Sequence, residues 1–196
     1  MVINVMTRDV WHAEPPRVES MIIRKATHVF WMNVKRNVCY TKVHCIELLK
    51  RAQRYNMSIQ NQRDIRYNFM VGGDGFVYEG RGWGQPPLLP REFARVNSES
   101  VVIGFMGFFN SVQELPNIMF KSGQTIVANG VRCRFIERDF IFHDFLVNKK
   151  RGDEDEQYKE IKQGRPVWYP KDPLANKFQR QGFKEEAKRL FPGRRG

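Results

Sequence analysis

The sequence predicts an α/β domain, in which strands and amphipathic helices follow one another along 196 residues. Its clearest signal lies in residues 64–83, where two apolar runs, Ile65–Val71 and Phe76–Tyr78, flank a turn rich in glycine and aspartate. Aromatic and β-branched runs joined in this way are typical of a β-hairpin, with the bend at Asp74-Gly75. A hydrophobic fraction of 41% in a chain of this length supports one folded domain, spanning residues 1–196.

Three elements are expected before the hairpin. Residues 5–16 end in Pro15-Pro16, which forces extended backbone, so this segment should lie as a strap with Trp11 in the core. Residues 27–31 have the composition of a buried strand. Residues 41–56 predict an amphipathic helix, because apolar side chains recur at roughly helical spacing behind a plausible N-cap, Thr41. Those apolar side chains are Val43, Ile46, Leu49 and Ala52.

A second set of elements is expected after the hairpin. Three prolines in residues 84–97 exclude a central strand or a helix interior there. Residues 101–109 form a nearly continuous apolar run, typical of a central strand buried on both faces. A helix is predicted at 118–131, just after Pro116, and a strand at 137–143.

A charged insertion at residues 148–176 interrupts the pattern. The basic run 149–151 precedes the acidic run 153–156, and a polar stretch follows. We expect this insertion to be solvent-exposed and partly disordered. A last helix is predicted at about 176–190, ending before Pro192.

The net charge of +12 invites a nucleic-acid hypothesis, but we find no zinc-finger, basic-zipper or RNA-binding signature. Nucleic acid is therefore not an expected partner, since a basic surface suits an anionic cell-wall polymer or membrane equally well. No stretch approaches the roughly 20 apolar residues of a membrane span. Residues 1–11 lack the features of a signal peptide, so we expect a cytosolic form or a chain without its leader.

The three cysteines bear on whether the protein works in an oxidising or a reducing cellular compartment. Cys39 and Cys45 are close enough in sequence for a loop-closing disulfide, or they are two unrelated buried thiols. A disulfide would indicate an oxidising compartment, and a possible glycosylation sequon begins at Asn56. Cys133 is expected to be a core thiol.

The hairpin segment DIRYNFMVGGDGFVYEGRGW resembles the signature of the peptidoglycan recognition proteins, whose fold is shared with zinc-dependent N-acetylmuramoyl-L-alanine amidases. The resemblance covers about 5–147 and 176–193. It implies a central mixed β-sheet flanked by helices and a disulfide between Cys39 and Cys45. It also implies an extracellular protein, secreted or the ectodomain of a membrane receptor, with a cytoplasmic isoform left open.

The resemblance also bears on catalysis. In the amidases, zinc is held by a histidine of a His-Thr pair, a histidine of a Gly-His-Arg element and a cysteine. These positions correspond here to Met32, His143 and Arg151. Only His143 suits zinc, because a thioether is a poor ligand for it and a guanidinium is permanently cationic. A tyrosine that assists catalysis in the amidases is retained as Tyr67.

The resemblance therefore implies a protein that is not an enzyme, with no catalytic residue, no bound metal and no cofactor. The alternative is a zinc-dependent N-acetylmuramoyl-L-alanine amidase with a rearranged metal site. Such a site would be built from His28, His44 and His143.

Ligand specificity is the last point of comparison. Family receptors for diaminopimelate-type stem peptides are similar in carrying a Gly-Trp pair and an arginine in an Asn-x-Arg-Ser element. The Gly-Trp pair is kept, but a glutamate stands at the arginine position, where it would repel a ligand carboxylate. The residues expected to line a peptidoglycan groove are Tyr67, Arg81, Gly82, Trp83, Glu99 and His143.

The function that the resemblance implies is a non-catalytic pattern-recognition protein of innate immunity. It would bind peptidoglycan fragments (muropeptides) or modulate receptors that do. Other peptidoglycan recognition proteins are expected as further partners, in a homodimer or a heterodimer.

Overall fold

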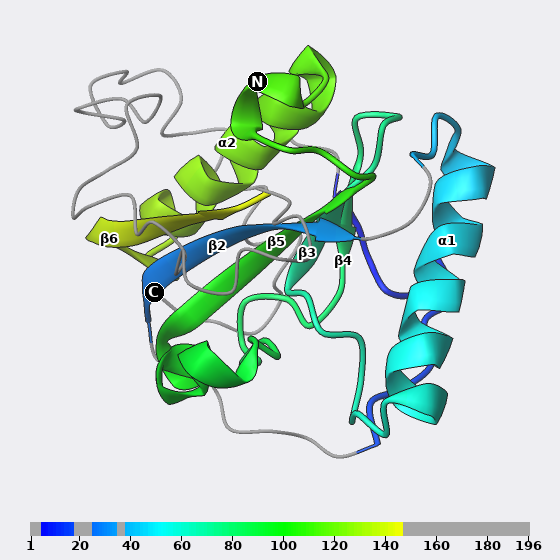
Figure 1. The fold of residues 1–196 in the computed structure, drawn as a ribbon, viewed down its shortest axis with the longest axis horizontal. Coiled ribbons are helices and arrows are strands. Elements are labelled where there is room, and N and C mark those ends of the chain that lie inside the picture. The colour runs from blue at the N-terminus through cyan, green and yellow to red at the C-terminus, as the bar shows by residue number, and fades with distance from the viewer. Residues whose placement is uncertain (1–4, 18–24, 35–37, 147–196) are drawn as a thin grey trace, which may run out of the picture.

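A computed structural model describes residues 5–17, 25–34 and 38–146 of the chain (Figure 1). The charged insertion at 148–176, the helix expected at 176–190 and Arg151 lie outside the described residues. None of the described helices is long and apolar enough to cross a membrane.

Six strands form one sheet in the order β1-β4-β3-β5-β2-β6. β3 and β4 pair antiparallel as the predicted hairpin, and every other neighbouring pair is parallel. The expected mixed sheet is therefore confirmed. The strands are β1 (Val5–Met6), β2 (Ala26–Val34), β3 (Phe69–Val71), β4 (Val77–Glu79), β5 (Ser100–Met106) and β6 (Ile136–Phe145).

The two long helices cover opposite faces of this sheet (Figure 1). They are α1 (Lys42–Arg54), which continues into a short π-helix, η1 (Tyr55–Ile59), and α2 (Asn117–Arg132). The central strand β5 is buried along its whole length, and its side chains alternate between the two faces. Ile103 packs in the cluster under α2, whereas Val102 packs in the cluster under α1.

Two glycines fix where strands end. Gly75 bends the hairpin with a φ of 83°, a left-handed conformation that glycine adopts without steric cost. Gly107 has a φ of 154° and follows Met106, so β5 stops there instead of continuing to residue 109. The first strand of the hairpin begins at Phe69, not at Ile65.

Helix α1 confirms its predicted N-cap and, except for Val43, its predicted apolar face. The Thr41 side chain accepts a hydrogen bond from the His44 backbone N–H at 3.3 Å. The buried residues are Cys45, Leu48, Leu49, Ala52 and Gln53. Val43 is 70% exposed, so its expected place in the apolar stripe was wrong. A strict three-residue spacing drifts around a helix of 3.6 residues per turn, which carries Val43 away from the face that holds Ala52.

The N-terminal strap is held by polar contacts. Trp11 is fully buried, as predicted, and its indole N–H donates to the carbonyl of Glu79 at 2.8 Å. Arg8 donates to both carboxylate oxygens of Asp64, at 2.8 and 3.2 Å. A two-pronged arginine–carboxylate pair fixes orientation as well as charge, so the strap is tied to the loop that precedes β3.

The cysteines are only partly as expected. Cys39 and Cys45 form a disulfide with a Cα–Cα distance of 5.1 Å, which joins the loop before α1 to the first turn of this helix. Cys133 is only partly buried, which corrects the expectation of a core thiol; burial raises the pKa of its thiol. Asn56 is 5% exposed and its side-chain amide donates to Gln60, so the folded chain does not offer the sequon to a glycosylating enzyme.

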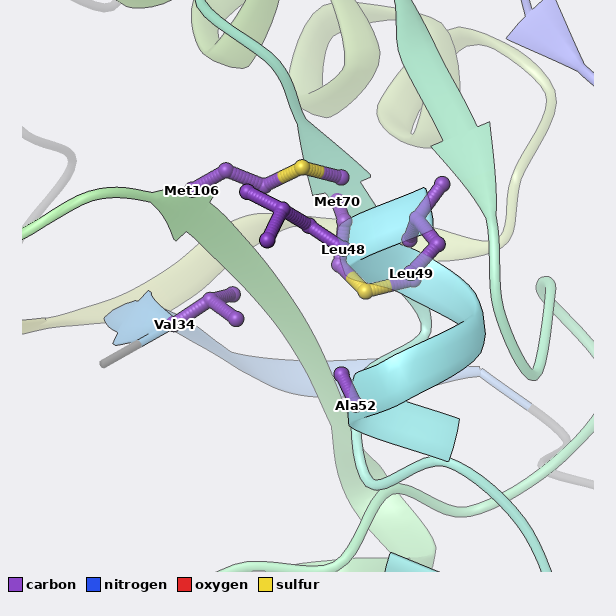
Figure 2. A pocket seen from close by; sticks show the side chains of 6 residues that line it. All are labelled: Val34, Leu48, Leu49, Ala52, Met70 and Met106. Atoms are coloured by element: carbon purple, nitrogen blue, oxygen red, sulfur yellow. The ribbon is translucent and has the colours of Figure 1, made fainter. Parts of the chain in front are cut away.

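A narrow apolar pocket remains between α1 and the sheet (Figure 2). Leu48, Leu49 and Ala52 of α1 face side chains from three strands, and the space between them has no room for a water molecule. The strand residues are Val34, Met70 and Met106. The pocket offers no polar group to a ligand, so it is a gap in core packing.

Truncation of Leu49 tests the packing of α1. Leu49 is 1% exposed, so Leu49→Ala removes buried apolar contact and enlarges the adjoining gap. We expect the free energy of unfolding to fall by about 2–5 kcal/mol in urea titrations. Val43→Ala, on the exposed side of the same helix, should change it by less than about 0.5 kcal/mol. Equal effects of the two variants would contradict the assignment of Leu49 to the buried face of α1 and of Val43 to its exposed face.

Candidate functional site

The face of the sheet under α1 gathers three residues that the resemblance singled out. Tyr67 is buried, and its hydroxyl donates to the backbone carbonyl of Asn33 at 3.2 Å. Burial raises the pKa of this phenol, so the hydroxyl remains protonated. The hydrogen bond places Tyr67 at the end of β2, next to Met32, whose side chain packs against the same apolar cluster. His143 lies on the neighbouring strand, β6.

His143 is enclosed by aromatic side chains. Its ring stacks on Phe30 with centroids 4.1 Å apart and an interplanar angle of 5°, and only 4% of the residue is exposed. Nε2 of His143 lies 2.9 Å from Nδ1 of His28. Burial, together with the charge of His28, lowers the pKa of His143 to about 4. The imidazole is therefore neutral at physiological pH.

The contact between His28 and His143 follows from strand register. β2 and β6 run parallel with a bulge after Ala26, so that Phe30 lies opposite His143 and His28 is the next residue on that face. Of the three histidines in the alternative zinc site, these two therefore meet. His44 lies in the exposed first turn of α1. Across the described ranges, no three histidine, cysteine, aspartate or glutamate side chains come together in a group that could hold a metal ion.

Glu99 ends a nine-residue 3₁₀ helix, η2 (Arg91–Glu99), which begins directly after the last of the three prolines in 84–97 and so corrects the expectation of no helix in that part of the segment. Its side chain is exposed, and Oε2 accepts a hydrogen bond from the Thr27 hydroxyl at 3.1 Å. Thr27 precedes His28 on β2. The structure thus brings Glu99 to the same end of β2 as the histidine pair.

Of the remaining predicted groove residues, Gly82 and Trp83 are buried and Arg81 is half-buried. Trp83 is 6% exposed and packs under α2, with its ring 4.5 Å from Phe69 and stacked at 5.2 Å on Phe135. Arg81 donates to the carbonyls of Ile65 at 2.6 Å and Pro86 at 3.0 Å. Both residues follow β4. Trp83 packs in the core and Arg81, half-buried, donates to two backbone carbonyls, so their place in a peptidoglycan groove stays a prediction.

Gly82 is buried as well, at the turn between Arg81 and Trp83. Its φ of 64° is a left-handed conformation. Glycine at this position permits the backbone turn, and its expected place in the groove stays a prediction.

Sequence reasoning missed one residue that completes the site. Phe93 of η2 packs its ring against Phe30, His143 and Phe145, at centroid distances of 5.6, 6.2 and 5.0 Å. Phe93 stands among polar residues in a segment broken by prolines, so no periodic pattern marks it. The candidate site is therefore an aromatic and imidazole cluster on β2 and β6, bordered by Tyr67 and covered by η2.

Comparisons with known proteins show which family the chain is similar to. No family model matches the chain. Peptidoglycan-recognition protein SC2 of Drosophila simulans is 32% identical over 145 residues, which is 74% of each chain. The solved ectodomain of the Drosophila transmembrane receptor PGRP-LCa is 25% identical, with a TM-score of 0.65 over 71% of this chain and 83% of that one.

A further solved structure is peptidoglycan recognition protein-LE in complex with tracheal cytotoxin, a monomeric diaminopimelic acid-type peptidoglycan. It is 26% identical, with a TM-score of 0.68 over 80% of this chain and 91% of that one. The mixed sheet, together with these similarities, defines an α/β domain of the peptidoglycan-recognition type. The chain belongs to the peptidoglycan-recognition protein family.

Because His143 is enclosed, we expect its imidazole to take up a proton only at acidic pH. The pKa of His143 in the folded chain lies below its ordinary value of 6.5, so the unfolded chain binds the proton more readily. The stability contributed by the neutral ring is complete above pH 6.5 and is lost as the pH falls through about 4. NMR titration of the ring protons, assigned with His143→Asn, should give a midpoint near 4. A midpoint near 6.5 would contradict the enclosed geometry.

Proposed function

We propose that the protein is a non-catalytic member of its family, which binds peptidoglycan fragments outside the cell without hydrolysing them. One observation carries the proposal. Met32, at the position that corresponds to the first zinc ligand of the resembling amidases, packs its side chain into the apolar cluster under α1. A thioether is a poor ligand for zinc, so the chemistry that activates water would have no first ligand there.

The binding part of the proposal rests on relatives. Protein-LE, at 26% identity, is solved with a peptidoglycan monomer bound. In this chain Tyr67 and His143 lie on the same face of β2, which supports a ligand site there. Innate immunity is the role that this kind of recognition supports.

The extracellular location is also a proposal. The disulfide between Cys39 and Cys45 is typical of oxidising compartments, and PGRP-LCa is a receptor whose ectodomain shares this fold. A partner of the same family, in a homodimer or a heterodimer, would suit a protein that passes a signal on without hydrolysing its ligand.

One observation favours the amidase with a rearranged zinc site as a second candidate. His28 and His143 bring two imidazole nitrogens within 2.9 Å of each other, and imidazole suits zinc. Against it, His143 is 4% exposed among aromatic rings, and a catalytic zinc keeps an open position for water. We therefore propose the receptor in preference to the enzyme.

Calorimetry with defined muropeptides tests the proposal. We expect saturable binding of a lysine-type or a diaminopimelate-type muropeptide, with no stem peptide released when the mixture is analysed by chromatography. An active amidase of known sequence, run in parallel, shows that release is detectable. Released stem peptide would establish the enzyme instead. Absence of binding to both ligands would indicate a regulator that acts through protein contacts.

Exchanging Glu99 for arginine tests the specificity part of the proposal. Arginine can form a bidentate pair with the extra carboxylate of diaminopimelate, whereas Glu99 repels it. We expect Glu99→Arg to raise the ratio of diaminopimelate-type to lysine-type affinity by on the order of tenfold, measured by calorimetry. Glu92→Arg makes the same charge change on the same helix and should leave the ratio unchanged. Equal changes in the two variants would show that overall charge decides.

A further inference from the structure

The 3₁₀ helix η2 has poorer hydrogen bonds and less buried surface than the strand β5 that follows it. It extends over nine residues, Arg91–Glu99, whereas 3₁₀ runs longer than three or four residues are uncommon because their hydrogen bonds are poorer. None of these nine residues, all of which the structure describes, is fully buried. The strand that follows, β5, is buried at every position. Segments with little buried surface open at low free-energy cost.

The chain on both sides of η2 is fixed. Before it, the carbonyls of Gly82 and Gln85 accept hydrogen bonds from the side chain of Asn68, which is fully buried. The carbonyl of Leu88 accepts from Arg66 at 3.2 Å. After it, Ser100 begins the central strand. Any displacement of η2 would therefore be confined between Pro90 and Ser100.

Ring packing and hydrogen bonds attach η2 to its surroundings. Val96 packs against the apolar cluster under α1 and its carbonyl accepts from the Ser100 hydroxyl, and Asn97 accepts from the Leu89 N–H. The Phe93 ring packs edge-on against Phe30 and Phe145, at interplanar angles of 66° and 90°, and against His143. At the other end of the helix, Glu99 accepts the hydrogen bond from Thr27. The Phe93 ring is thus surrounded by three other rings, and the hydrogen bond from Thr27 to Glu99 holds the C-terminal end of η2 against β2.

The surface beneath Phe93 has the composition of a ligand site. Phe30 is fully buried and His143 nearly so, and they share their face of β2 and β6 with Phe145 and His28. Sites for small ligands are mostly apolar and aromatic, with a few polar groups that fix orientation. Here the imidazoles would be those polar groups.

We propose that η2 is a lid over an aromatic floor formed by Phe30, His143 and Phe145, and that a peptidoglycan fragment binds this floor when the lid is open. Phe93 is the plug that holds the lid closed. The ligand part of this inference rests on the proposed function, whereas the lid part stands on the geometry of η2 alone. With the lid mostly closed, the measured affinity is the intrinsic affinity reduced by the fraction of open molecules.

Hydrogen exchange, followed by mass spectrometry on the full chain, tests the lid. Peptides covering 91–99 should exchange faster than those covering 101–106. Phe93→Ala should accelerate exchange in 91–99 by on the order of tenfold, because the plug contacts are lost. Phe108→Ala, which truncates a phenylalanine that is 48% exposed, is the control and should leave 91–99 unchanged. Protection of 91–99 equal to that of 101–106 would overturn the lid.

Calorimetry on the same variants tests the ligand part. Phe93→Ala should bind a muropeptide on the order of tenfold more tightly than the unmodified chain, since a larger fraction is open. Thr27→Val removes only the hydrogen bond to Glu99 and should shift affinity in the same direction by less. Weaker binding by Phe93→Ala would make Phe93 a ligand contact and overturn the plug. Absence of binding in every variant would overturn the proposed function, and hydrogen exchange would still decide whether the lid exists.

Discussion

The side chain of Asn68 is the contact on which the arrangement of this protein depends. It is fully buried, and its amide nitrogen donates to the carbonyls of Gly82 and Gln85 at 2.8 and 2.7 Å, while its oxygen accepts from the Val102 N–H at 2.8 Å. Its backbone carbonyl also accepts from Gly80 and Gly82. Loss of this amide would leave several buried polar groups without partners, at about 1–3 kcal/mol each. Asn68 thereby fixes the hairpin, the central strand and the segment that leads to η2 relative to one another.

This arrangement assigns different roles to the two faces of the sheet. Under α2, Trp83 stacks between the sheet and Phe135 and serves packing. Under α1, the face near β2 and β6 carries Tyr67 and His143, and the His143 imidazole is enclosed and neutral at physiological pH. This arrangement fits the proposal of a family member that recognises peptidoglycan without hydrolysing it.

The sequence predicted most elements because their patterns are local. The hairpin turn and the cap at Thr41 follow from residue types and short spacings, whereas the disulfide, which the spacing left open, was implied by the family resemblance. The site was harder to predict, since its members meet through strand register: His28 reaches His143 across the parallel pair of β2 and β6. Phe93 carried no periodic signal, and Trp83 matched a family motif without revealing that it points inward. Residue types along the sequence indicated the family. Which side chains are exposed and which meet across the strands could be seen only in the structure.

Zinc content tests most directly whether the fold has lost its metal chemistry. The full chain would be purified, equilibrated with zinc, freed of unbound metal by gel filtration and analysed by plasma mass spectrometry, with His28→Ala and His143→Ala as matched variants. The account predicts zinc far below one ion per chain, and no difference between the variants and the unmodified protein. One zinc per chain that is lost in either variant would contradict it, because the histidine pair would then hold a metal as an amidase requires.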